Sequence, residues 1–307
     1  MTDSFVASQF LESVTLKNVE IEARRLALAM EMASEIVLED LQTLCWFQLS
    51  HRSGFVREKA LRQLAGPAPH PFLLALALRR LNDWVPEVRA AARQVLPTVL
   101  LASDPDWLAQ TLWLILSHWA SWGRLGEAER KVVLGLAAHP EVLLLLLSDL
   151  QQCSAGPAAK VLTQLGRCDI LDVYLPLLAR TARQPAVRVK AYRSLFSGKM
   201  QWFAGRQWQW TDVRYCQGRQ VNVIAERFLN SGVAFEKTLT QASRDPAVAV
   251  RRLAAEVLIT QFARCERRVA ETLIARLALD PSPSVAERGA FAQRKYLDAL
   301  ESGIHGL

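Results

Sequence analysis

The sequence predicts an all-α protein in which pairs of helices stack on one another. A short helical pattern recurs along the 307 residues, and no run of alternating β-branched residues bounded by turn dipeptides marks a strand. Apolar side chains make up 51% of the chain, enough for a substantial continuous core. Together these observations favour a repeat protein made of helices over a mixed fold.

The clearest copies of the pattern begin at Asp83 and Asp245. Counting from each aspartate, valine is the fifth following residue, arginine the sixth, alanine the ninth and leucine the thirteenth. His51 opens a third copy, and weaker copies begin at Gln184 and Asp280. Successive copies start 32, 101, 61 and 35 residues apart, and the two longer gaps divide into units of roughly 30 to 34 residues, a length typical of helical repeats.

Each position of the pattern has a physical role in a helix. An aspartate accepts hydrogen bonds from the free N–H groups at a helix start, and a proline beside it already has a helical φ. The valine, alanine and leucine form one apolar stripe, and the small alanine lets a neighbouring helix approach closely. One helix pair cannot bury this stripe alone, so neighbouring pairs must stack.

These segments resemble the second helix of a HEAT-type repeat. The resemblance implies an α-α superhelix, a HEAT-like solenoid of about seven to nine helix pairs. It also implies that the basic residue of each copy pairs with the cap acid of an adjacent repeat. The structural motif residues would then be Asp83, Asp245 and the basic side chains Arg57, Arg89, Lys190 and Arg251.

A single solenoid domain is expected, with parts that follow one another along the chain. Residues 1–45 would be N-terminal capping helices, with looser packing before about residue 17, and residues 46–200 HEAT-like repeats. Residues 201–222 would be an irregular basic and aromatic insert or a degenerate repeat, and 223–301 the C-terminal HEAT-like repeats. Residues 302–307 would form a loose tail.

Residues 180–228 depart from the repeat pattern in charge and in aromatic content. They hold ten basic residues against Asp212 and Glu226, a net charge of +8 in a chain of net charge +7. Such a local excess attracts anionic partners. The basic residues are Arg180, Arg183, Arg188, Lys190, Arg193, Lys199, Arg206, Arg214, Arg219 and Arg227.

The same segment contains the candidate partner-binding residues, in which indole rings and guanidinium groups alternate. Trp208 and Trp210 are two apart and cannot both face inward on a regular helix, so at least one is expected near the surface. Rings and cations together suit nucleobase stacking, and they equally suit a protein hot spot, whereas Trp202 and Phe203 also fit as core filler. The candidate set is Trp202, Arg206, Trp208, Trp210, Arg214 and Arg219.

The function favoured by these observations is a non-catalytic scaffold or adaptor that binds a protein partner. The sequence has no phosphate loop, nucleophile elbow or HExxH, which argues against an enzyme, and it gives no reason to expect a cofactor or a metal. The alternative is a nucleic-acid-binding solenoid. Some bacterial alkylpurine DNA glycosylases have a HEAT-like fold with aromatic residues and an aspartate at the lesion, and Asp212 is the one candidate carboxylate for that chemistry.

Targeting features point to the cytoplasm. The N-terminus has no basic leader or apolar h-region, and no apolar stretch reaches the roughly 20 residues that a membrane span needs. The five cysteines form no CxxC pair and fit a reducing compartment. A membrane partner is therefore not expected.

Overall fold

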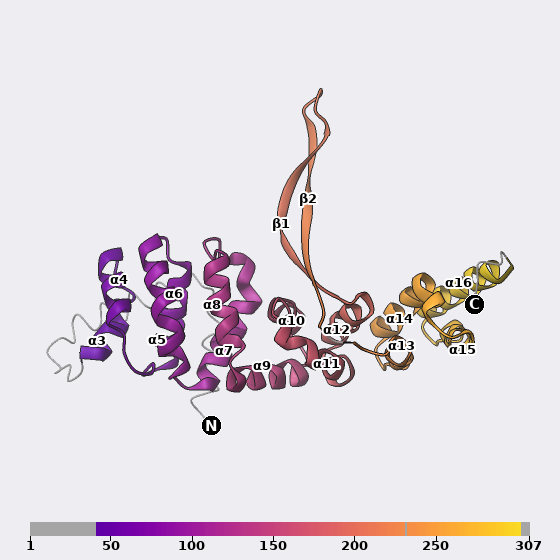
Figure 1. The fold of residues 1–307 in the computed structure, drawn as a ribbon, viewed down its shortest axis with the longest axis horizontal. Helices are drawn as coiled ribbons and strands as arrows, with labels where there is room; N and C mark the ends of the chain where they lie inside the picture. Colours follow the sequence, from indigo (N-terminus) through magenta and orange to yellow (C-terminus); the bar gives the residue numbers. More distant parts are fainter. Residues whose placement is uncertain (1–40, 231, 302–307) are drawn as a thin grey trace. The chain divides into compact units, whose positions relative to one another are not determined.

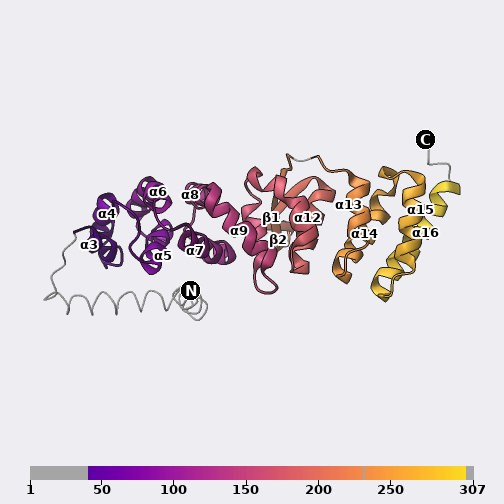
Figure 2. The same ribbon diagram turned by 90° about the horizontal axis from the view of Figure 1, so that it is seen from below.

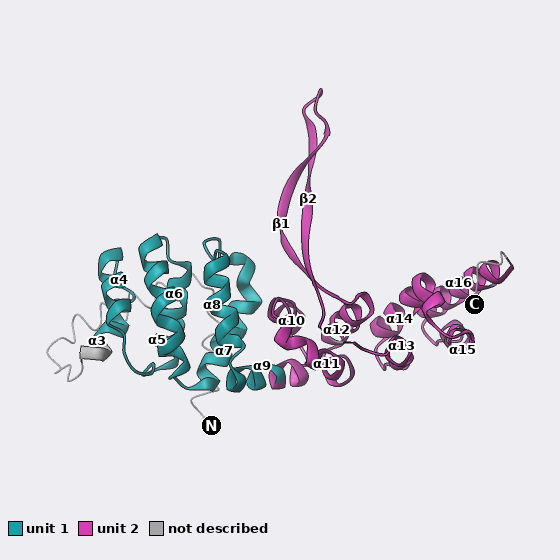
Figure 3. Cartoon of the chain, viewed as in Figure 1, with its two compact units in different colours: residues 1–147 teal, residues 148–307 magenta. Residues whose placement is uncertain are grey.

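The computed structural model describes residues 41–230 and 232–301, and these are mostly helical (Figure 1). The expectations for the capping helices before residue 41 and for the tail 302–307 lie outside the described residues. The chain divides into two compact units, Met1–Leu147 and Ser148–Leu307 (Figure 3). The helix α9 (Pro140–Gln152) crosses the boundary between them.

In unit 1, alternate helices stack on one another: α4 packs on α6, and α6 packs on α8. Proline at the first helical position begins α5, α6 and α7, where its missing N–H costs no hydrogen bond. The elements are α3 (Leu41–Gln48), α4 (Gly54–Gln63), α5 (Pro71–Arg79), η1 (Arg80–Asn82), α6 (Pro86–Leu101), α7 (Pro105–His118), η2 (Trp119–Ser121) and α8 (Glu127–Ala137).

The apolar positions of the repeated pattern form the core between these helices. Val88, Ala92 and Leu96 of α6 are fully buried, as is Ala60 of α4. Val56 was expected to be buried as well, but it is only half-buried. The alanines confirm the predicted close contact, because a larger side chain at either position would have no room between the stacked helices.

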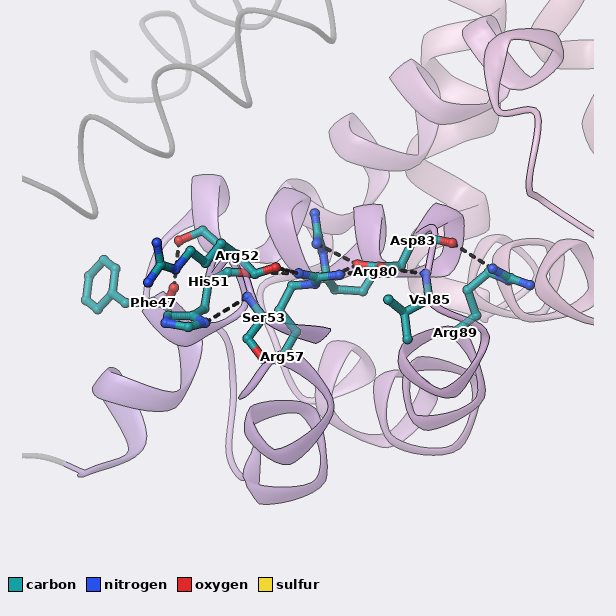
Figure 4. A network of polar contacts seen from close by, with 10 residues as sticks. Phe47, His51, Arg52, Ser53, Arg57, Arg80, Asp83, Val85 and Arg89 are labelled. Atoms are coloured by element: carbon teal, nitrogen blue, oxygen red, sulfur yellow. Dashed lines mark hydrogen bonds and ion pairs between the residues drawn. The ribbon is translucent and has the colours of Figure 1, made fainter. Parts of the chain in front are cut away.

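A buried ion pair joins the first two copies of the pattern (Figure 4). Arg57 Nε and Nη2 donate to the two carboxylate oxygens of Asp83 at 2.9 and 2.7 Å, and Arg57 Nη1 donates to the backbone oxygen of His51 at 2.7 Å. Asp83 also accepts from Arg80 at 2.7 Å and from the N–H of Val85 at 3.0 Å. The aspartate therefore shapes the turn before α6 and does not occupy the N-cap itself, which is Val85.

Arg89 makes the corresponding contacts in the second copy of the pattern, but its ion pair is longer than that of Arg57. Its Nη1 donates to the backbone oxygen of Asp83 at 2.7 Å, and its Nε lies 3.8 Å from a carboxylate oxygen of Glu129. Arg93 forms the closer ion pair with the same buried glutamate. Glu129 thus takes the place of the cap acid that the repeat pattern lacks in this part of the chain.

Unit 2 has the same alternate stacking, with α12 on α14 and α14 on α16. Helices α13 to α16 follow one another in chain order in Figure 2. The helical elements are α10 (Ala158–Leu165), η3 (Asp169–Tyr174), α11 (Leu175–Thr181), α12 (Pro185–Ser197), α13 (Phe235–Ala242), α14 (Val248–Gln261), η4 (Phe262–Arg264), α15 (Arg267–Ala278) and α16 (Pro283–Glu301).

The ion pairs of unit 2 correct the register of one predicted copy. Arg188, and not Lys190, donates to both carboxylate oxygens of Asp245 at 2.8 Å and to the backbone oxygen of Ala182 at 2.7 Å. Counted from Ala182, valine, arginine, alanine and leucine fall at the expected positions, so this copy begins two residues before Gln184 with alanine in the aspartate position. Lys190 instead donates to the backbone oxygen of Gln201 at 2.5 Å.

The last copy of the pattern has glycine where the others have alanine. Arg251 donates to Asp280 at 2.6 and 3.0 Å, which links α14 to the turn before α16. A Cβ atom on Gly289 of α16 would overlap the backbone of Leu277 and Ala278 at the end of α15. The two helices approach so closely that even an alanine would not fit.

The prediction of a fold without any sheet is wrong at one place. Strands β1 (Lys199–Asp212) and β2 (Gln217–Phe228) form a two-stranded antiparallel sheet that projects from unit 2 (Figure 1). Residues 201–222, where an irregular insert or a degenerate repeat was expected, thus lie in a hairpin and not in repeat helices. The sheet extends beyond the expected insert, 201–222, at both ends.

Within the described residues, no single helix has the length and apolar character that a bilayer crossing requires. The bent pair Glu127–Ala137 and Pro140–Gln152, with 84° between its two helices, meets those criteria by length and composition only.

Candidate macromolecule-binding arm

The β-hairpin of residues 199–228, here called the arm, contains all the predicted partner-binding residues. Its register pairs Lys199 with Phe228 at the base and Asp212 with Gln217 at the far end. A four-residue turn, 213–216, closes the hairpin, and Cys216 takes a left-handed φ of 51° there. Ala204 and Thr211 of β1 have no partner in β2, so β1 carries two bulges whereas β2 is paired at every residue.

An arginine of β2 anchors the arm to the helical part of unit 2. Arg227 donates to both carboxylate oxygens of Asp172 at 2.9 and 2.6 Å, and to the backbone oxygens of Gly166 and Cys168 at 2.7 and 2.6 Å. Asp172 is only 1% exposed and also accepts from the N–H of Asn230 at 2.7 Å. A bidentate pair with this many additional hydrogen bonds fixes both position and direction at the base of the arm.

Side chains of β1 complete the base. Met200 is fully buried and occupies the space beside Gly166, where a Cβ atom would overlap the methionine side chain. The guanidinium of Arg167 lies 5.1 Å from the centre of the Trp202 ring. Trp202 is therefore half-buried and contributes to the packing between the arm and the helices, as expected for a core side chain.

Alternation along the strands gives the arm two different faces. Paired residues share a face, and successive residues point to opposite sides. One face, here called the aromatic face, collects most of the large apolar side chains of the arm. Its large apolar residues are Phe203, Trp208, Trp210, Ile224 and Phe228. Beyond the base of the arm, the one cation on this face is Arg206.

The rings of the aromatic face are held in place although they are exposed. Trp208 and Trp210 meet edge to face, with 5.6 Å between ring centres, and are 48% and 54% exposed. The Trp208 ring leans over Gly218, where a Cβ atom would lie within 2.6 Å of it. Both tryptophans thus reach the surface on the same side, because the segment is a strand and not the helix assumed from the sequence.

The remaining predicted residues lie elsewhere on the arm. Arg219 pairs with Gln209 on the face opposite the two tryptophans. Arg214 is in the turn, with a side chain 87% exposed and its Nε 3.7 Å from Asp212. The structure therefore brings Arg206, Trp208 and Trp210 together, and separates them from Trp202 and Arg219.

The basic excess of residues 180–228 is partly neutralised by pairing. Arg188 and Arg227 are engaged by buried aspartates, and Lys199 pairs with Glu226 at 2.5 Å. Hydrogen bonds from Lys199 and Gln201 hold the pKa of the Glu226 carboxyl below its usual value. Of the arm's own cations, Arg206 and Arg219 form no ion pair with any described residue.

Asp212, the one candidate catalytic residue, has a local structural partner. It accepts a hydrogen bond from the N–H of Arg214 at 2.9 Å, which fixes the turn at the end of the arm. Its side chain is 32% exposed on an open ribbon. In the described part of the chain, no group of three or more His, Cys, Asp or Glu side chains is arranged to hold a metal ion.

Three residues of the aromatic face were not among the predicted partner-binding residues: Phe203, Ile224 and Phe228, which are 48%, 54% and 73% exposed. The sequence signal that could have indicated a strand in β2 is the group of three β-branched residues Val221, Val223 and Ile224 within five positions. Comparison of the chain with protein-family models, with curated proteins and with solved structures finds no match in any of the three.

Proposed function

We propose that the chain is a HEAT-like α-solenoid that acts as a non-catalytic scaffold or adaptor. Six consecutive pairs of described helices pack against each other, which supports the proposed stacking of helix pairs: α3–α4, α5–α6, α7–α8, α11–α12, α13–α14 and α15–α16. The recurring arginine–carboxylate pairs and the packing of alternate helices support the same assignment. The five free cysteines support a cytoplasmic location.

The partner that we propose is a protein, bound through the aromatic face of the arm. One observation carries this proposal: Phe203, Trp208, Trp210 and Ile224 share one side of a two-stranded ribbon and are each about half exposed. Exposed apolar patches of this kind mark interaction sites, and tryptophan and arginine dominate protein hot spots. The surface of a partner protein that fits this face would have an apolar pocket for the indole rings and a carboxylate opposite Arg206.

The test compares two double variants of the same strand. Trp208→Ala with Trp210→Ala removes the rings of the aromatic face, and Gln207→Ala with Gln209→Ala changes the interleaved exposed residues of the opposite face. We expect the tryptophan variant to retain about a tenth or less of each specific partner in quantitative mass spectrometry of co-purified proteins, because hot-spot truncation costs about 2 kcal/mol or more. Equal partner recovery from both variants would place the binding surface elsewhere.

A second candidate function is nucleic-acid binding, with the aromatic face stacking on bases. The observation that favours it is the pair of cations, Arg206 and Arg219, that no described carboxylate neutralises. Binding to a single-stranded oligonucleotide would then weaken steeply as salt rises, because phosphate contacts release counterions. For the glycosylase form of this function, release of an alkylated purine would have to be lost in Asp212→Asn.

A further inference from the structure

The outer edge of β2 has features that leave it open to pairing with another strand. β2 continues for 12 residues without a bulge, whereas both bulges of the hairpin lie in β1. Helices α10 and α12 pack against β1, and the sheet has no third strand among the described residues. β2 contains no proline and no lysine, two residues with which proteins commonly protect an exposed edge.

The middle of β2 also has the composition of a strand that pairs with copies of itself. Residues 220–225 read Gln-Val-Asn-Val-Ile-Ala, which contains no charge, no glycine and no proline. Six-residue segments of high β-propensity and low charge are the usual sites of edge-to-edge pairing. From Gln201 to Phe228, moreover, no residue of the arm is buried, and an isolated two-stranded ribbon is marginally stable in water.

From these features we infer that two copies of this chain associate through antiparallel pairing of their β2 edges, with Asn222 facing Asn222 on the two-fold axis. In this register Val221 lies opposite Val223 of the second copy, Gln220 opposite Ile224, and Arg219 opposite Ala225. Because a two-fold axis perpendicular to the sheet keeps each face on its own side, the result is a four-stranded sheet with two aromatic faces side by side.

Charge disfavours one of the two neighbouring registers. A pairing centred on Val223 would place Arg219 of one copy directly opposite Arg227 of the other, and like charges in opposite positions destabilise a sheet. With Asn222 at the centre, Arg227 lies opposite Gln217 and Glu226 opposite Gly218. Asn222 is also near the midpoint of β2, so this register pairs almost the whole length of the two strands, from Gln217 to Arg227 of each copy.

A cysteine on the axis tests the pairing in the full chain. In a Cys216→Ser background, which removes the exposed thiol of the turn, Asn222→Cys places two cysteines opposite each other. Opposite residues have Cα atoms about 4.5 to 5.5 Å apart, within the range of a disulfide. Gln220→Cys is the matched control: it lies on the same face of the same strand, but its two copies are about 13 Å apart in this register.

We expect Asn222→Cys to give at least about tenfold more disulfide-linked dimer than Gln220→Cys under mild oxidation, because only the axial pair meets disulfide geometry. A mixture of Gln220→Cys and Ile224→Cys chains should form the mixed disulfide. The chain without added cysteines should show a concentration-dependent mass in sedimentation. Equal yields from the two single variants, or a monomer at every concentration, would overturn self-pairing. A chain that stays monomeric because β2 instead pairs with a strand of another protein would also give this contradicting result. This result is independent of the aromatic-face experiment, because the edge and the face are changed by different substitutions.

Discussion

Arg227 of the arm and Asp172 of the 3-10 helix η3 form a bidentate ion pair at 2.6 and 2.9 Å, the connection that fixes the arm to its helical unit. The carboxylate is almost completely buried, and the guanidinium satisfies two further backbone oxygens. Removing either partner alone leaves buried polar groups without hydrogen bonds, whereas removing both charges together leaves fewer of them.

Replacing Arg227 with alanine should therefore destabilise unit 2 and release the base of the arm. Loss of one partner of a buried ion pair costs about 3 to 5 kcal/mol, and we expect a decrease of that size in the free energy of unfolding. Urea denaturation followed by circular dichroism measures the decrease. Arg193→Ala, an exposed change on α12, serves as the control and should change stability by less than about 0.5 kcal/mol. The double variant Arg227→Ala, Asp172→Asn should recover part of this loss. If the double variant is as unstable as Arg227→Ala alone, the lost free energy of unfolding does not come from the unpaired carboxylate.

Asp83 should make the free energy of unfolding of unit 1 depend on pH in the acidic range. Burial raises its pKa, but hydrogen bonds from Arg57 and Val85 and the charges of Arg80 and Arg57 outweigh burial, so the pKa lies below its ordinary value. The unfolded state then binds the proton more tightly, and the stabilisation is present above the ordinary pKa of about 4 and is lost as pH falls through the lower folded value. Unfolding free energies measured from pH 7 to pH 2 should show a smaller loss in Asp83→Asn than in the parent. Parallel curves would contradict this assignment.

The two helical glycines Gly289 and Gly135 should respond in opposite ways to alanine. A Cβ at Gly289 overlaps the backbone of α15, whereas a Cβ at Gly135 in α8 meets nothing within 4 Å. We expect Gly289→Ala to destabilise by about 1 to 3 kcal/mol through overpacking. Gly135→Ala should stabilise by about 0.5 to 1 kcal/mol, because alanine has the higher helix propensity. Thermal unfolding of the two variants decides the comparison, and a stabilised Gly289→Ala would show that α15 and α16 are less tightly packed.

A charge placed in the stacked core should be far more costly than one on its surface. Ala92 is fully buried between helices of unit 1, and Gln94 on the same helix is exposed. Ala92→Asp should destabilise by several kcal/mol, since a buried carboxylate without a partner loses its hydration. Gln94→Asp should change the unfolding free energy by less than about 0.5 kcal/mol, and equal effects of the two changes would contradict the repeat register.

The helical part of the fold could be predicted because repetition makes weak local signals add up. Each copy places valine, arginine, alanine and leucine at fixed spacings, and the buried side chains follow that spacing. The register near Arg188 was missed because alanine replaces the aspartate at position 182, so the following proline was taken as the marker. The ion pair with Asp245, 57 residues away, identifies the correct arginine, and the spacing counted from Ala182 agrees with it.

The arm could be located from the sequence but its structure could not. Clustered rings and cations marked residues 180–228, yet the search for strands relied on β-branched residues, and β1 alternates glutamine with tryptophan. A helical assumption then gave Trp208 and Trp210 different directions, although strand alternation places them on one side. The arginine pairings that neutralise part of the basic excess depend on distant acids such as Asp172, which no local pattern reveals.

Arg206 and Arg219 distinguish the two candidate partners, because the arm carries them on opposite faces. The triple change Arg206→Ala, Arg214→Ala and Arg219→Ala should leave unfolding nearly unchanged, since exposed charges contribute little to stability, and should weaken binding by more than about tenfold. A protein bound on the aromatic face requires Arg206, so Arg206→Ala alone should account for most of that loss and Arg219→Ala for little of it.

The affinity for a nucleic acid would instead depend on both Arg206 and Arg219. Each lost phosphate contact weakens binding by a similar factor and makes the salt dependence shallower, whichever face the cation occupies. Affinity measurements for the two single variants at low and moderate salt therefore separate the functions: unequal effects with little salt dependence identify a protein partner, and equal effects with strong salt dependence identify a nucleic acid. If the triple variant binds as tightly as the parent to every partner, the arm's cations take no part in recognition, and the exposed surface of the unit 1 helices is the next region to test.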